Sequence, residues 1–177
     1  MRRLSVLSGP ALGLAATVLA ASVMAHDGAH PKSKAGVAPA SWDFTLPTLD
    51  GTRFVQAARI AGPLLVNFWG RDCAPCVAEL PRLQAFADAN PHWTVLLVST
   101  DAPGDAREFV QRYGVTLPVL RSGANVAGLM RSAGNRSGGL PFSVALAGAA
   151  VCSTQAGELG TADLERWARE CGVARQP

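Results

Sequence analysis

Two cysteines separated by two residues carry the clearest chemical signal in this chain of 177 residues. The segment Cys73-Ala74-Pro75-Cys76 directly follows the apolar run 64–69. Cysteines at this spacing lie one helical turn apart, close enough to bond reversibly, and a helix start offers unpaired N–H groups to a thiolate. The pattern predicts a buried strand that delivers a dithiol to a helix N-terminus, an arrangement suited to disulfide exchange.

Each cysteine has a distinct expected role. Cys73, at the mouth of the helix, is predicted to be the exposed thiolate that attacks a disulfide. Cys76 is predicted to be the resolving thiol, which releases the partner and closes the internal bond.

Three other interpretations of the pair are weaker. A purely structural disulfide would leave Cys73 unreactive toward thiol reagents. A c-type haem attachment would need His after the second cysteine, where the chain has Val77, and no second close pair of cysteines or histidines completes a zinc site. Redox chemistry is therefore favoured, with no cofactor and no resident metal.

Glu79 is the third candidate catalytic residue. It follows Cys76 by three residues, so it projects from the same helical face and can hold a proton near the sulfurs. The alternative is a glutamate of the first turn that complements the helix dipole.

The elements that position these residues alternate between strands and helices. Apolar runs predict buried strands, and apolar residues at helical spacing predict amphipathic helices, one of which continues past Pro81 with a kink. The pattern predicts an α/β fold, a mixed central sheet with helices on both faces and an added N-terminal hairpin. The expected elements are a hairpin over 42–46 and 52–55, strands 64–69, 94–99 and 117–120, a hairpin over 142–146 and 150–154, and helices from Cys76, around 106–113, within 125–132 and over 161–171, the last with Thr161 as N-cap.

Cys152 and Cys171 require a separate interpretation. From Cys152 the strand extends for about 17 Å, and the last helix runs back over about 15 Å. Because these lengths are nearly equal, Cys171 is expected to lie close to Cys152. A structural disulfide is therefore feasible and would stabilise the domain by roughly 3 kcal/mol. The alternative is two separate buried thiols.

The N-terminal residues predict export. Arg2 and Arg3 precede an apolar stretch, and small residues end it at Ala25, so residues 1–25 are expected to be a signal peptide; an uncleaved membrane anchor is the alternative. Residues 26–40 are expected to form a flexible tether before a single domain over 41–175. His26 and His30 in the tether would make only a weak metal site.

Charge excludes one class of partner. The net charge is +3 and falls to +1 without Arg2 and Arg3, and the sequence has no basic cluster. Nucleic acid is therefore not an expected partner.

Several landmarks in sequence order resemble the TlpA/ResA-like branch of the thioredoxin superfamily. They are Asp43-Phe44-Thr45-Leu46-Pro47 with Asp50-Gly51, Val66-Asn67-Phe68-Trp69, the set Cys73, Cys76, Glu79 and Pro81, Tyr113-Gly114-Val115 with Leu117-Pro118-Val119, and Gly139-Leu140-Pro141-Phe142-Ser143. The resemblance implies a cis proline at Pro141 and client contacts from Trp69, Leu140 and Pro141. It also assigns the acid–base role to Glu79. One departure is Asp72, where the family usually has an aromatic residue; an aspartate there opposes ionisation of the thiol, and Arg71 can offset it.

The resemblance implies a thiol–disulfide oxidoreductase, periplasmic or otherwise extracytoplasmic, soluble after signal cleavage or membrane-anchored. The implied clients are exported proteins with disulfides, such as apocytochromes c or copper-centre proteins. An unidentified membrane or periplasmic donor would supply the electrons. The alternatives are a disulfide-forming oxidant of the same fold and a non-catalytic module that delivers metal.

Overall fold

A five-stranded mixed sheet forms the centre of the protein in the computed structural model, which describes residues 41–172. The strand order is β5-β4-β3-β6-β7, formed by β3 (Pro63–Trp69), β4 (Thr94–Ser99), β5 (Val119–Arg121), β6 (Phe142–Ala147) and β7 (Ala150–Ala156). Strands β3, β4 and β5 are parallel, whereas β6 runs antiparallel to both β3 and β7. The expected thioredoxin-like mixed sheet is confirmed.

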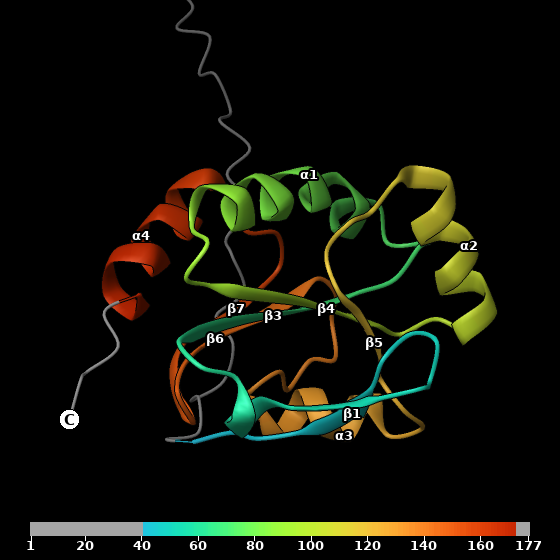
Figure 1. Ribbon diagram of the computed structural model, residues 1–177, viewed down its shortest axis with the longest axis horizontal. Helices are drawn as coiled ribbons and strands as arrows, with labels where there is room; N and C mark the ends of the chain where they lie inside the picture. Colours follow the sequence, from blue (N-terminus) through green and yellow to red (C-terminus); the bar gives the residue numbers. More distant parts are fainter. Residues whose placement is uncertain (1–40, 173–177) are drawn as a thin grey trace, which may run out of the picture. The chain divides into compact units, whose positions relative to one another are not determined.

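Helices cover both faces of this sheet, as Figure 1 shows. One face carries α1 (Ala74–Ala89), α2 (Pro103–Tyr113) and α4 (Thr161–Cys171). The other face carries α3 (Val126–Ser132) and a small hairpin of β1 (Thr45–Pro47) and β2 (Phe54–Gln56), followed by the 3-10 turn η1 (Ala57–Arg59). Each face has its own apolar cluster.

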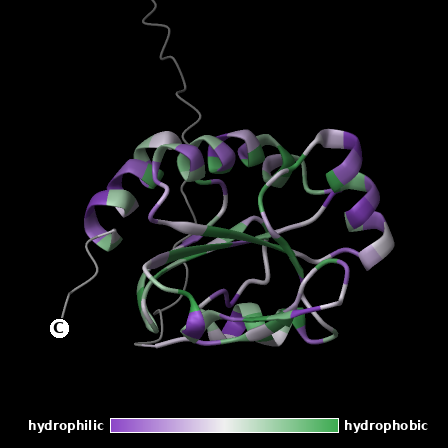
Figure 2. Cartoon of the chain, viewed as in Figure 1, coloured by the Kyte–Doolittle hydropathy of each residue, from purple (hydrophilic) through white to green (hydrophobic). Residues whose placement is uncertain are grey.

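The central strand β3 separates the two clusters. All seven of its residues are buried, and side chains alternate between the faces: Leu65 joins the α1 side and Val66 the α3 side. Figure 2 shows the corresponding pattern, with hydrophobic colour along the strands and hydrophilic colour on the outer surfaces of α2 and α4. Burial on both faces explains why β3 is almost entirely apolar.

A disulfide joins the last helix to the edge of the sheet. Cys171 of α4 is buried and bonds Cys152 of β7, with 5.8 Å between their Cα atoms. Leu164 and Trp167 lie buried on the same face of α4. The sequence allowed either a disulfide or two separate buried thiols, and the structure contains the disulfide.

Three local expectations need correction. Strand β5 is Val119–Arg121 and not 117–120, because Pro118 has no N–H to donate and only its carbonyl pairs, with Leu97 N–H. The N-cap of α4 is Gly160 and not Thr161, because Asp163 Oδ2 accepts the N–H of Gly160 at 3.0 Å.

The first hairpin is also shorter than expected. Its strands are β1 and β2, and Trp42 and Phe44 lie outside them, buried in the cluster on the α3 side. Helix α1 continues across Pro81, as predicted.

The predicted signal peptide and tether lie outside the described residues. Between residues 41 and 172 no helix has the length and apolar character needed to span a membrane.

Candidate active site

The two cysteines lie where β3 ends and α1 begins. Cys73 is the N-cap residue of α1, Ala74 is its first helical residue, and Pro75 follows in the first turn. The sulfurs of Cys73 and Cys76 are bonded, with 5.2 Å between the Cα atoms. Proline is well suited to this turn because N–H groups there have no intrahelical acceptor.

The surroundings of the two sulfurs differ. Cys73 is half-buried, whereas Cys76 has no exposed surface. An external thiol can therefore reach the disulfide at Cys73 but not at Cys76. In the reduced protein, likewise, only Cys73 can reach a disulfide of another protein.

A tight turn fixes the approach to Cys73. The N–H of Cys73 donates to Gly70 O at 3.2 Å, and the N–H of Arg71 donates to Asp101 Oδ2 at 3.0 Å. The Arg71 guanidinium pairs with Asp105 at 3.0 Å and with Asp72 at 3.7 Å. The guanidinium thus lies closer to Asp105 than to Asp72, the carboxylate next to Cys73 in sequence.

Trp69, the last residue of β3, packs in the core next to the cysteine turn. It is fully buried, and its ring lies 5.0 Å from that of Phe109, centroid to centroid. Since Trp69 has no exposed surface, the contact with clients expected from the sequence is not available in this structure. Its role here is to fill the core beneath the cysteine turn.

The Leu140–Pro141 peptide bond is cis, as the resemblance implied. Phe142, the next residue, pairs with Phe68 across the β3–β6 ladder, so Pro141 lies at the same edge of the sheet as the turn after Trp69. Leu140 also approaches that turn: a Cβ placed on Gly70 would lie 3.8 Å from Leu140 Cδ1. The cysteine turn and the cis-proline loop are therefore neighbours.

Glu79 is buried within the fold, in the second turn of α1. Its Oε2 accepts the N–H of Leu159 at 2.8 Å, and its Oε1 accepts Asn67 Nδ2–H at 2.6 Å. Burial raises the pKa of Glu79 to about 7, against the opposing effect of these two hydrogen bonds. The alternative of a first-turn glutamate that complements the helix dipole does not fit this position, because Glu79 is the sixth residue of α1.

Sequence reasoning missed the partners of Glu79. Asn67 lies on β3, Ser143 on β6, and Leu159 in the segment before α4. The one available signal was Asn67, the only polar residue in the apolar run of β3. Leu159 could not be found in this way, because its contribution is a backbone N–H.

An apolar groove lies beside α1, the helix that carries the cysteines. It has a volume of about 340 Å³ and lies between α1 and α2, lined among others by Val77, Leu80, Phe109 and Tyr113. Val77 directly follows Cys76, and Tyr113 is an exposed aromatic residue.

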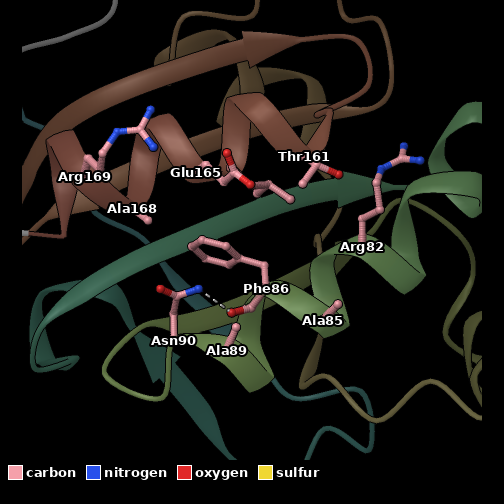
Figure 3. A pocket seen from close by; sticks show the side chains of 10 residues that line it. Arg82, Ala85, Phe86, Ala89, Asn90, Thr161, Glu165, Ala168 and Arg169 are labelled. Atoms are coloured by element: carbon pink, nitrogen blue, oxygen red, sulfur yellow. Dashed lines mark hydrogen bonds between the residues drawn. The ribbon is translucent and has the colours of Figure 1, made fainter.

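A second groove, of about 410 Å³, lies between α1 and α4 (Figure 3). Arg82, Phe86 and Asn90 line one side, and Glu165 and Arg169 line the other. Its first residue on α1 is six positions beyond Cys76, about 9 Å along the helix, so it does not include the redox pair.

Metal-ligating side chains do not gather in the described part of the chain. Between residues 41 and 172, no group of three or more His, Cys, Asp or Glu side chains is placed to hold an ion. His26 and His30 lie outside that range.

Comparisons with known proteins agree with this geometry. The AhpC/TSA family matches residues 37–133, more than half of the chain. The soluble secreted antigen MPT53 of Mycobacterium tuberculosis is 31% identical over 127 residues, covering 71% of this chain and 72% of that protein. The thiol–disulfide oxidoreductase ResA of Halalkalibacterium halodurans is 29% identical over 89 residues, or 48% of this chain and half of ResA. The solution structure of a putative thioredoxin from Neisseria meningitidis superposes with a TM-score of 0.60 at 26% identity, covering 77% of this chain and 89% of that one.

The chain belongs to the AhpC/TSA family. The TlpA/ResA-like resemblance within the thioredoxin superfamily is confirmed, and so is the class of enzyme, a thiol–disulfide oxidoreductase.

We expect the stability of the oxidised protein to fall as the pH rises, through Glu79. Its folded pKa of about 7 exceeds the ordinary 4.5, so the folded state binds this proton more tightly. The resulting stabilisation is fully present below pH 4.5 and is lost as the pH rises through 7. Urea unfolding at pH 5 and pH 8 should therefore show wild type losing about 2 kcal/mol more than Glu79→Gln.

Glu170→Gln provides a matched control, because Glu170 is an exposed glutamate near the end of α4. It should retain the wild-type dependence on pH. If Glu79→Gln and wild type lose stability in parallel, Glu79 does not carry the shifted proton.

Proposed function

We propose that this oxidoreductase reduces disulfides of exported client proteins outside the cytoplasm. The observation that carries the proposal is the unequal exposure of the two sulfurs, with Cys73 half-buried at a helix N-cap and Cys76 fully buried. An attacking thiolate must meet a foreign sulfur, whereas a resolving thiol has only to reach its neighbour.

The reaction transfers two electrons. In the reduced protein the Cys73 thiolate attacks the client disulfide, forms a mixed disulfide and releases one client sulfur as a thiolate. Cys76 then loses its proton and attacks Cys73, which releases the second client sulfur and closes the Cys73–Cys76 bond. The client gains two electrons and two protons, and an external dithiol donor must reduce the enzyme again.

Glu79 is suited to accept the proton that Cys76 releases. It lies three residues beyond Cys76 on α1, both side chains are fully buried, and its pKa is raised to about 7 by that burial. A buried thiol has no water to receive its proton, so a nearby carboxylate that is partly ionised at neutral pH makes the resolving step easier.

The client surface would surround Cys73. The cis Pro141 and Leu140 lie beside the cysteine turn, and the groove between α1 and α2, lined among others by Val77, offers apolar surface along the same helix. An extended client segment can pair with backbone groups of the cis-proline loop while its side chains occupy this groove.

The relatives support a location outside the cytoplasm. MPT53 is described as a soluble secreted antigen, and a structural neighbour from Streptococcus pneumoniae as an exposed lipoprotein thioredoxin. The predicted signal peptide or anchor over residues 1–25 fits the same location. We further propose apocytochromes c or copper-centre proteins as clients and a membrane or periplasmic protein as electron donor.

The direction of electron flow is tested by the reduction potential of the Cys73–Cys76 pair. A reductant requires a potential close to that of thioredoxin, about −270 mV. Equilibration of the purified protein with glutathione or dithiothreitol buffers, read by mass spectrometry after alkylation, gives the value. A potential close to about −120 mV, that of the oxidant DsbA, would instead make the protein a disulfide-forming enzyme.

Client identity is tested by a Cys76→Ser variant, expressed with its native N-terminus. Cys73 should then accumulate mixed disulfides with clients, because the resolving thiol is missing. Cys73→Ser/Cys76→Ser is the matched control and should capture nothing. Recovery of cytochrome or copper-protein precursors supports the proposed client class, and an empty trap together with inert wild type contradicts the enzymatic proposal.

A further inference from the structure

Three buried side chains form a polar chain across the core. Asn67 on β3 lies between Glu79 on α1 and Ser143 on β6, and none of the three has exposed surface. Ser143 is two residues from the cis Pro141. The chain thus connects the helix that carries the cysteines with the strand that carries the cis-proline loop.

Glu79 only accepts hydrogen bonds here, the pattern that suits an ionised carboxylate. Asn67 Nδ2 donates to Glu79 Oε1 at 2.6 Å and to Ser143 Oγ at 2.9 Å, which uses both of its hydrogens. Leu159 N–H donates to Oε2 at 2.8 Å. Asn67 Oδ1 is buried and has no hydrogen-bond partner among residues 41–172.

Protonation of Glu79 disturbs this pattern. Each carboxyl oxygen faces an N–H donor, Leu159 N–H at Oε2 and Asn67 Nδ2 at Oε1, and of these two only the side-chain amide of Asn67 can turn to offer an acceptor. A half-turn of the Asn67 amide would remove the conflict. Oδ1 would then accept from the Glu79 hydroxyl, and it could also accept from Ser143, whose hydroxyl can act as donor or acceptor.

We infer that Asn67 is a positioning residue whose amide reverses with the protonation of Glu79, with Ser143 changing from acceptor to donor. When Glu79 is ionised, Nδ2 points at Oε1. When Glu79 gains one proton, Oδ1 takes that place, and no covalent bond of Asn67 or Ser143 changes. The catalytic meaning of this exchange rests on the proposed role of Glu79 in proton transfer.

Other charged and titratable groups act on the same carboxyl. Arg82 of α1 pairs with Glu158, and its Nε donates to Leu159 O at 3.2 Å. Arg82 favours the ionised form of Glu79, and Glu158 opposes it. In the reduced protein the thiols of Cys73 and Cys76 titrate on the same helix, so the test uses the oxidised protein, in which neither sulfur carries a proton.

The first test titrates the wild-type protein and uses a variant only for assignment. NMR of the oxidised wild-type protein would follow the Glu79 carboxyl carbon and the Asn67 side-chain amide hydrogens from pH 5 to 9, with Glu79 assigned through Glu79→Gln. Both amide hydrogens should move upfield on acidification, because both lose their acceptors, and with the same midpoint as the carboxyl. Amide resonances that do not follow the titration of Glu79 would overturn the inference.

The second test uses Asn67→Leu, which has similar volume and no polar group. Asn67 bonds the ionised carboxylate of Glu79 more strongly than it would bond the protonated carboxyl. Removing both bonds should therefore raise the pH midpoint of the Glu79 titration by on the order of half to one unit. Ser122→Ala is the matched control, a buried serine whose Oγ contacts Gly123 O and not this chain, and it should leave the midpoint unchanged. An unchanged midpoint in folded Asn67→Leu would contradict the positioning role.

These outcomes are separate from those of the proposed function. Both titrations are read in the oxidised protein without a client, so coupled titration in a protein that reduces no disulfide would refute the proposed reaction and leave the inference standing. If the reaction is also as proposed, the pH profile of disulfide reduction should shift in Asn67→Leu by the same amount as the Glu79 midpoint.

Discussion

The unequal burial of two sulfurs on one helical turn is the constraint on which the rest of the structure depends. It follows from the place where α1 begins. The buried strand β3 ends at Trp69, a turn of three residues follows, and Cys73 caps the helix at the surface while Cys76 faces the core.

The buried second sulfur has no water to receive its proton, and in the proposed mechanism the buried carboxyl of Glu79 receives it. A carboxyl group in the core is unfavourable when ionised, and Glu79 remains partly ionised at neutral pH only because Asn67 and the N–H of Leu159 bond to it. The same burial that destabilises the charge raises the pKa of Glu79 to about 7, so the carboxyl is partly ionised at neutral pH. If Glu79 transfers the proton as proposed, stability and catalysis are linked through this one side chain.

Much of this arrangement could be predicted from local sequence. Strand β4 and the body of α4 match the expected ranges, since each is defined by apolar residues at the period of its own element. The cysteine pair was identified by its spacing and by the strand before it. The N-cap of α4 was missed because Asp163, three residues further on, bonds the backbone of Gly160.

The contacts that define the environment of the site could not be predicted in this way. Glu79 meets Leu159 across 80 residues of sequence, and Asn67 meets Ser143 across 76. Trp69 was expected to touch clients, but its place in the packing against Phe109 depends on how α2 returns over the sheet. Such long-range contacts leave no periodic signal within a single segment.

The central claim, that Cys73 is the accessible and readily ionised sulfur, is tested most directly by alkylation of the reduced protein. Iodoacetamide would be added across a range of pH, and the modification of each cysteine followed by mass spectrometry. The account predicts that Cys73 reacts first, at pH values below those at which a free cysteine reacts, and that Cys76 reacts far more slowly. Equal rates at the two cysteines, or a Cys73 that reacts no more readily than a free thiol, would contradict it.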